Sequence, residues 1–189
     1  MFDIVLADPP WDYKGQRQHA GAGSADTGGA TTHYPSLKLP DLKRLDVPSL
    51  CAKDCLLFLW ATNPHLDQAI ELMKAWGFKW ATVGFVWDKE RVNPGFYTMS
   101  QYELCLIGKR GKIPQPRGSR NQRQMVKAPR QKHSAKPEEI QDRIDLMFPT
   151  QKKLELFARR HRTGWTCTGN ELDGLDVFDW LEIYKEKSN

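Results

Sequence analysis

FDIVLADPPW, residues 2–11, joins a short apolar run to an acidic residue, two prolines and a tryptophan. The run Phe2–Ala7 has the length and composition of a buried strand, and Pro9 and Pro10 end it abruptly. In open α/β sheets, functional sites lie beyond the carboxyl ends of the strands. Asp8 is therefore predicted to stand at such a site.

Further apolar runs alternate with helical patterns along the chain, which is typical of an α/β sheet. Strands are predicted at 56–60, 80–87, 102–107, 153–157 and 165–168, and helices within 39–50, at 64–76, from Pro137 onward and at 177–184. We expect these elements to form a single domain, 1–189, because a chain of 189 residues can bury roughly 70 % of its unfolded surface in one core. Residues 14–33, rich in small residues and without periodicity, are predicted to form a mobile loop.

The composition argues against a membrane protein, a secreted protein and a metalloprotein. No stretch reaches the roughly 20 apolar residues of a membrane span, and Asp3 stands where a signal peptide carries a basic residue. A cytoplasmic, nucleoid-associated protein is expected. Cys51 and Cys55 have a spacing that zinc ligands also show, but the five histidines are scattered. Reduced, mostly buried thiols and no metal are expected.

Positive charge is concentrated in one segment. The formal net charge is +5, and residues 109–132 contain nine Lys or Arg and no Asp or Glu. This pattern favours a polyanionic partner, and the segment 109–133, broken by prolines, is predicted to be a basic arm that orders on binding. Its candidate phosphate contacts are Arg117, Arg120, Arg123 and Lys127. The alternative is a solvated charged loop.

The tetrapeptide Asp8-Pro9-Pro10-Trp11 combines hydrogen-bond acceptors with a flat aromatic surface. Prolines donate no N–H, so the carboxylate of Asp8 and the carbonyl of Pro9 could accept the two hydrogens of an aromatic amine such as the exocyclic amino group of adenine. Trp11 could stack on the base. The alternative is an ordinary proline turn in which Asp8 caps the backbone and Trp11 belongs to the core.

These residues carry a family resemblance that runs through nearly the whole chain. The tetrapeptide, with GNELDG at 169–174, resembles the DPPW-type adenine-N6 methyltransferases, the family of the catalytic subunit of the eukaryotic messenger-RNA adenosine methyltransferase. The resemblance includes LFLW at 57–60, ELCL at 103–106, KPEEI at 136–140 and KLELFAR at 153–159. It implies a Rossmann-like sheet in circularly permuted order, with the catalytic strand first and the cofactor half last.

The resemblance also implies a cofactor, S-adenosylmethionine, and roles for individual residues. Cofactor contacts are expected from Asp8, Lys136, Phe157, Arg159, His161, Asn170 and Glu171. Among these, Asn170 and Glu171 would hold the ribose hydroxyls, and the cations would suit the methionine carboxylate. Besides the basic arm, substrate contacts are expected from Trp11, Tyr34, Glu103 and Lys136.

The predicted function is methyl transfer to the N6 amino group of adenine in DNA, by a monomer or a homodimer. DNA is favoured over RNA because no appended RNA-binding module is recognisable and the short chain resembles bacterial and phage DNA methyltransferases. RNA adenosine methylation is the first alternative. A catalytically silent nucleic-acid-binding scaffold is the second, and the presence of both Asp8 and Trp11 argues against it. Methylation of a protein amide is a third reading, against which Asp8 argues.

Overall fold

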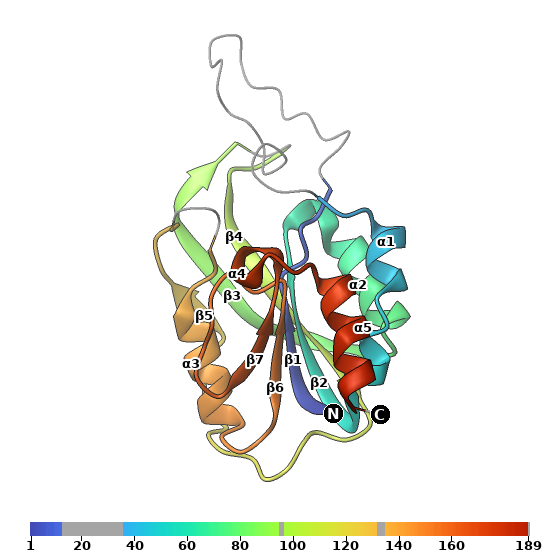
Figure 1. Cartoon of the computed structure of the whole chain (residues 1–189). Helices are drawn as coiled ribbons and strands as arrows, with labels where there is room; N and C mark the ends of the chain where they lie inside the picture. Colours follow the sequence, from blue (N-terminus) through green and yellow to red (C-terminus); the bar gives the residue numbers. More distant parts are fainter. Residues whose placement is uncertain (13–35, 95–96, 132–134, 189) are drawn as a thin grey trace.

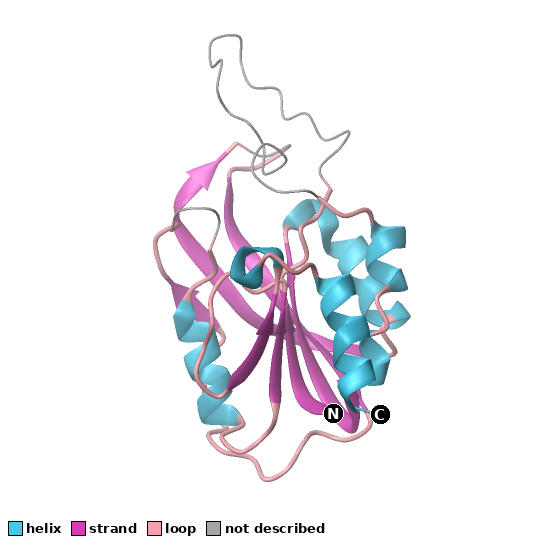
Figure 2. Cartoon of the chain, viewed as in Figure 1, coloured by secondary structure: helices cyan, strands magenta, loops and turns pink. Residues whose placement is uncertain are grey.

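A mixed β-sheet organises the part of the chain that the computed structural model describes, namely residues 1–12, 36–94, 97–131 and 135–188. Within these residues seven strands form one sheet in the order β5-β3-β4-β2-β1-β6-β7 (Figures 1 and 2). The strands are β1 Phe2–Ala7, β2 Cys51–Ala61, β3 Lys79–Asn93, β4 Ser100–Arg110, β5 Met125–Lys127, β6 Lys153–Leu156 and β7 Trp165–Thr168.

The strand β1 lies between β2 and β6 and is parallel to both, with Leu6 paired to Phe58 on one side and to Glu155 on the other. A strand enclosed in this way is buried on both faces, which explains its nearly continuous apolar sequence. The carboxyl ends of β1, β2, β6 and β7 therefore meet at one edge of the sheet. Asp8 follows β1 at this carboxyl edge.

Helices cover both faces of the sheet (Figure 1). On one face, α1 Leu39–Arg44, α2 Leu66–Ala75 and α5 Val177–Ser188 pack through Leu42, Leu72 and Leu181. On the other face, α3 Glu138–Met147 packs through Ile140 and Ile144 against Ile4 and Leu6. Short turns Val47–Leu50 (η2) and Asn63–His65 (η3) and the short helix α4 Asn170–Asp173 complete the described elements.

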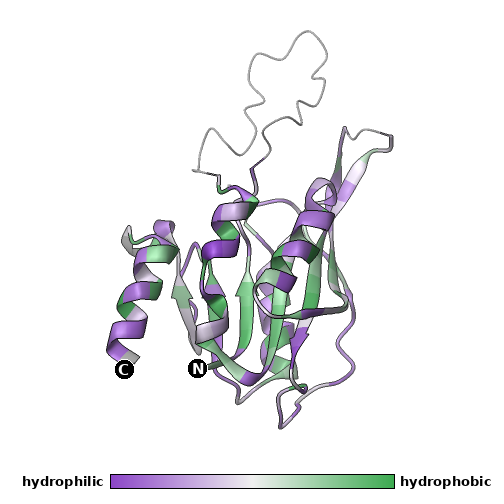
Figure 3. Ribbon diagram, turned by 90° about the vertical axis from the view of Figure 1, so that its right-hand side faces the viewer, coloured by the Kyte–Doolittle hydropathy of each residue, from purple (hydrophilic) through white to green (hydrophobic). Residues whose placement is uncertain are grey.

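The central strands are mostly hydrophobic, whereas the helices alternate hydrophobic and hydrophilic residues (Figure 3). None of the described helices combines the length and the apolar character needed to cross a membrane. Cys51 and Cys55 are both buried in the core cluster on the side of α1, α2 and α5.

The predicted α/β class is confirmed, and every predicted strand and helix is present; β1 and β7 have the predicted ends, and the ends of the other elements are shifted. Residues 153–157 were predicted as a strand, but β6 ends at Leu156 because Phe157 takes a left-handed conformation with φ of 62°. The order of a circular permutation stays a prediction. The predicted loop 14–33 lies outside the described residues.

Most of the predicted basic arm lies along the domain. Residues 111–131 find partners on the domain itself, and their ordering on binding stays a prediction. The amides of Gly118 and Ser119 donate to carbonyls at the end of α3, and β5 pairs with β3. Arg143 of α3 donates to two backbone carbonyls of the arm, those of Arg123 and Met125.

Candidate active site

The sheet face that α3 covers changes from apolar to charged toward the carboxyl edge. Side chains alternate along a strand, so residues two apart share a face. On β1, Ile4 and Leu6 belong to the apolar cluster beneath α3, and Asp8 is the next residue in this series. On β3, Trp87 belongs to the same cluster and the buried Lys89 follows it.

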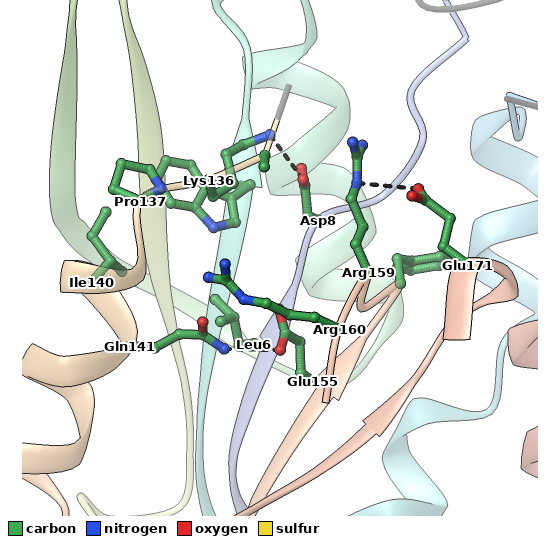
Figure 4. A pocket seen from close by; sticks show the side chains of 13 residues that line it. Leu6, Asp8, Lys136, Pro137, Ile140, Gln141, Glu155, Arg159, Arg160 and Glu171 are labelled. Carbon is green, nitrogen blue, oxygen red and sulfur yellow. Dashed lines mark hydrogen bonds and ion pairs between the residues drawn. The ribbon is translucent and has the colours of Figure 1, made fainter. Parts of the chain in front are cut away.

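A cavity of about 240 Å³ opens at this charged end of the sheet. Figure 4 shows Lys136 approaching Asp8 from one side and Arg159 with Glu171 approaching from the other. The cavity wall is apolar in part and charged in part. Its apolar side chains include Leu6, Trp60, Ile140 and Phe157. Its acidic residues are Asp8, Glu155 and Glu171, and its basic residues are Lys136, Arg159 and Arg160. It can therefore hold a ligand that has an apolar body and groups of both charges.

Lys136 lies between two carboxylates. Its Nζ is 2.8 Å from Oδ2 of Asp8 and 3.3 Å from Oε2 of Glu103, and it stands 5.4 Å from the centre of the Trp60 ring. Burial alone would lower the pKa of Lys136, but the charges of Asp8 and Glu103 outweigh burial and raise it. This lysine is therefore a fixed cation at neutral pH.

Glu103, on β4, is buried together with its partners. Burial would raise the pKa of its carboxyl group, but the neighbouring Lys136 and Lys89 hold that pKa below its usual value. Glu103 is thus ionised, and its charge is compensated by lysines from two different parts of the chain.

Glu155, on β6, has the opposite environment. Burial raises its pKa to about 6, although Gln141 of α3 donates a hydrogen bond of 2.8 Å to its carboxylate and lowers the pKa in part. This carboxyl group therefore changes its charge close to neutral pH.

Two loops meet at the other side of the cavity. The amide of Ala158 donates to the carbonyl of Thr168 at 2.8 Å, and a Cβ atom on Gly169 would lie 2.3 Å from the carbonyl oxygen of Ala158. Only glycine permits this approach. It brings Arg159 next to Glu171, with Nε 3.4 Å from Oε1.

The predicted cofactor residues are not all gathered at the cavity. Asp8, Lys136, Phe157, Arg159 and Glu171 line it. Asn170 and His161 are exposed and are not among the residues that line it.

The structure corrects the prediction that Trp11 stacks on the base. The indole is 5 % exposed, donates from Nε1 to the carbonyl of Trp60 at 3.2 Å and stacks on His65 with ring centres 5.6 Å apart. It therefore belongs to the core and is not a platform for a base, as the alternative of an ordinary proline turn supposes. Its backbone amide donates to the carbonyl of Pro9 at 2.9 Å, which closes the turn after Asp8.

Only the second half of the described basic arm lies toward the carboxyl edge of the sheet, beside β3. Arg117 stacks on Phe148, 4.9 Å from the ring centre, and the following residues bond to the end of α3. That helix end lies at the amino edge of the sheet, since Gln151, just before β6, bonds to Pro116. Arg117 and Arg120 are thus at the edge opposite Asp8.

Arg123 precedes β5, and its carbonyl accepts from Arg143 in the middle third of α3. Lys127 ends β5 and pairs with Glu90 at 3.7 Å, and Arg130 donates to Asn93 at the end of β3. Because β3 runs in the same direction as β1, Lys127 and Arg130 lie toward the carboxyl edge. Tyr34 lies outside the described residues.

Sequence reasoning missed Trp60, Gln141, Glu155 and Arg160 as cavity residues. A signal existed for Glu155, which interrupts the apolar strand KLEL between Leu154 and Leu156. A charged residue in the middle of a central strand is costly to bury unless a site uses it. Gln141 carried no signal, because helix periodicity alone does not tell a cavity wall from a solvent face.

The chain is similar to several known methyltransferases. The family model described as MT-A70 matches residues 2–171. The chain is 46 % identical over 181 residues to the Type II methyltransferase M.MunI of a Mycoplasma species, covering 90 % of this chain and 78 % of that protein.

More distant relatives are eukaryotic. The chain is 30 % identical to the N(6)-adenosine-methyltransferase MT-A70-like of Arabidopsis thaliana, covering 94 % of the chain and 25 % of that protein. It is 29 % identical to the N(6)-adenosine-methyltransferase catalytic subunit METTL3 of Homo sapiens, covering 94 % of the chain and 29 % of that protein. The chain thus corresponds to only a part of these longer proteins.

Proposed function

The chain belongs to the MT-A70 family, and on this premise we propose that it is an adenine-specific DNA methyltransferase that uses S-adenosylmethionine. The observation that carries the proposal is the contact of 2.8 Å between Lys136 and Asp8. Both residues line a cavity of mixed charge at the carboxyl edge of the sheet.

Asp8 and Pro9 supply the acceptors for the adenine amino group. The amine is a poor nucleophile because its lone pair is delocalised into the ring. A carboxylate and a carbonyl that accept its two hydrogens favour a pyramidal nitrogen with an available lone pair. The Pro9 carbonyl already accepts the Trp11 amide, but a carbonyl oxygen has two lone pairs, so one remains. Oriented groups of this kind contribute a few kcal/mol each at a transition state.

The cavity residues fit S-adenosylmethionine. Its amino-acid end needs groups of both charges, which Glu155, Arg159 and Lys136 offer, and its ribose diol needs an acceptor, which Glu171 offers. Phe157 and Ile140 provide apolar surface. When bound, the cofactor supplies a methyl group that its sulfonium makes electrophilic. The protein's own contribution is to orient the amine and to hold the Asp8 carboxylate beside Lys136.

DNA is the substrate that the comparisons favour over RNA. The chain covers 78 % of the Type II methyltransferase and shares 46 % identity with it, whereas it covers 25 to 29 % of two of the adenosine methyltransferases at 29 to 30 % identity. Lys127 and Arg130, near the carboxyl edge, are the proposed phosphate contacts. A DNA substrate implies a cytoplasmic, nucleoid-associated enzyme. RNA adenosine methylation is the alternative.

The test is methyl transfer from labelled S-adenosylmethionine to matched DNA and RNA oligonucleotides, followed by mapping of the methylated base. N6-methyladenine in the DNA is expected. Asp8→Asn should lower the turnover by about 100-fold or more, since oriented polar groups of this type contribute that much. The matched control is Asp67→Asn, an exposed acid in the first turn of α2.

The control variant should keep its turnover within about twofold, because a surface charge at a helix end is worth well under 1 kcal/mol in most cases. Methylation of RNA alone would support the alternative substrate. Absence of methylation in either nucleic acid would support a silent scaffold, and full turnover in Asp8→Asn would refute the role of the carboxylate.

A further inference from the structure

A second buried lysine stands behind the proposed catalytic centre. Lys89 is 7 % exposed, and its Nζ lies 3.5 Å from Oε1 of Glu103, which is itself 6 % exposed. Lysine is rarely buried to this extent unless it is paired, because an ammonium group loses several kcal/mol of hydration. The neighbouring Glu90 is exposed, so the burial of Lys89 is specific to this position.

The backbone of β3 directs Lys89 into the protein. Phe85, Trp87 and Lys89 alternate along the strand, and the first two belong to the apolar cluster beneath α3. Directly after Lys89, Glu90 has a φ of 56°, and the pairing of β3 with β4 shifts register between Asp88 and Asn93. A left-handed residue that is not glycine is uncommon and costs of the order of 1–3 kcal/mol. The strand therefore bends at the point where its last inward side chain reaches Glu103.

Lys89 is the end of an alternating series of charges. From it the series runs to Glu103 at 3.5 Å, from Glu103 to Lys136 at 3.3 Å and from Lys136 to Asp8 at 2.8 Å. The four formal charges cancel. The shortest contact is the one to Asp8, and Oε2 of Glu103 makes no hydrogen bond within the described residues. Lys136 is thus bound more closely to Asp8 than to Glu103.

We propose that Lys89 is a positioning residue for methyl transfer: by compensating the charge of Glu103, it keeps Lys136 in place beside Asp8. This inference rests on the proposed function. Without Lys89, Lys136 would be the remaining ion-pair partner of Glu103 among the described residues, and Coulomb attraction in a buried site is strong. Lys136 would then shift toward Glu103, and Asp8 would lose the contact that fixes its orientation.

The charged groups that face this series come from several elements. Glu103 is faced by Lys89 of β3 and by Lys136 before α3, and Lys136 is faced by Asp8 after β1. The charge of Arg159, after β6, also acts on Lys136 and disfavours its protonated form. The buried thiol of Cys105, two residues after Glu103 on β4, has a raised pKa and stays neutral.

The test compares Lys89→Met with Lys89→Arg, which keeps the charge. Lys79→Met is the matched control, because Lys79 is an exposed lysine at the start of the same strand. Lys89→Met should lower kcat by about 10- to 100-fold with little change in the KM for DNA, since a displacement of about 1 Å at a catalytic group has an effect of this size. Lys89→Arg should restore most of the rate, and Lys79→Met should stay within about twofold of the wild type.

The pH profile separates positioning from a loss of packing. Lys89 lowers the pKa of Glu103, so its removal should move the acidic limb of the kcat profile to higher pH. A Lys89→Met protein that is folded, with the kcat and the acidic limb of the wild type, would overturn the proposal. If Lys89→Met does not fold, Lys89→Gln, which keeps a hydrogen-bond donor without the charge, replaces it under the same criteria.

A measurement without turnover distinguishes this proposal from the proposed function. Unfolding midpoints of Lys89→Met, Glu103→Gln and the double variant form a double-mutant cycle. If the unfolding midpoint of the double variant is no lower than that of the less stable single variant, the coupled series is supported. If the decreases of the two single variants add up in the double variant, the coupled series is contradicted. An inactive wild type that shows the coupling would refute methyl transfer and the positioning role together, but not the charge series itself.

Discussion

At the scale of single residues, two glutamates of the site have environments that separate their charge states. Glu103 is buried between two lysines, which lower its pKa, whereas burial raises the pKa of Glu155 to about 6. When the pKa values of two carboxyl groups in one site are shifted in opposite directions, the two groups have different roles in that site. Glu103 is a permanent anion that organises the lysines, and Glu155 is an anion that the site can lose on mild acidification.

We predict that Glu155→Gln stabilises the protein at pH 7.5 without ligand. The folded pKa of about 6 lies above the ordinary value of 4.5, so the ionised form is penalised in the folded state. This penalty is absent below about pH 4.5 and grows as the pH rises to about 6, where it becomes complete. Removing the carboxylate should therefore raise the unfolding midpoint at pH 7.5 and leave it nearly unchanged at pH 4.5.

The check is a series of thermal unfolding curves across that range. Glu138→Gln is the control, because its exposed carboxylate pairs with Arg160 at the same side of the protein. A midpoint for Glu155→Gln that falls below the wild type at pH 7.5 would contradict the assigned environment. The same variant should bind S-adenosylmethionine more weakly, because it lacks the carboxylate that would pair with the cofactor's ammonium group.

At the scale of elements, residues 111–131 join the two edges of the sheet. Their first part lies at the amino edge with Arg117 on Phe148, and β5 leads their last part to the carboxyl edge. The charge pattern alone could not reveal this division, because a uniform series of basic residues does not show where the chain turns. The contacts that decide it are backbone hydrogen bonds to α3, which have no signature in side-chain chemistry.

We predict that Lys127→Ala with Arg130→Ala weakens DNA binding and lowers the salt dependence of the affinity by about 1 to 2 log units per log unit of salt. Each phosphate contact contributes roughly 0.9 to that slope for duplex DNA. Arg120→Ala removes a charge from the same segment at the opposite edge and should leave the slope unchanged. Binding titrations at several salt concentrations provide the measurement, and equal slopes for the two variants would contradict the division.

At the scale of the whole molecule, local pattern and long-range pairing contributed unequally to what could be predicted. β7 was predicted with its observed ends, and the expected site at Asp8 lies at the observed cavity, because both depend on short apolar runs and their stops. Trp11 was misjudged, since its partners, Trp60 and His65, come from distant parts of the chain. The predicted strand 80–87 was too short for a similar reason, because the polar end of β3 is held by pairing with β4.

We predict that S-adenosylhomocysteine, the demethylated cofactor, stabilises the molecule as a whole. A ligand at 100 times its Kd adds about 2.7 kcal/mol to the free energy of unfolding, which for a chain of this size raises Tm by about 5–10 °C. Glu171→Ala, at the cavity, should reduce the shift, and Glu186→Ala, exposed on α5, should keep it. An unchanged Tm of the wild type at saturating ligand would show that the cavity does not take this molecule.

The central place of β1 has a consequence for synthesis on the ribosome. Ile4 and Leu6 are synthesised long before one neighbouring strand, β6, which begins only at Lys153. Until that strand appears, one side of β1 presents unpaired N–H and C=O groups on a nearly uniform apolar segment, which invites association with other chains. A polypeptide released before residue 153 should therefore be insoluble and should recruit chaperones, whereas a chain that includes β6 covers the same segment.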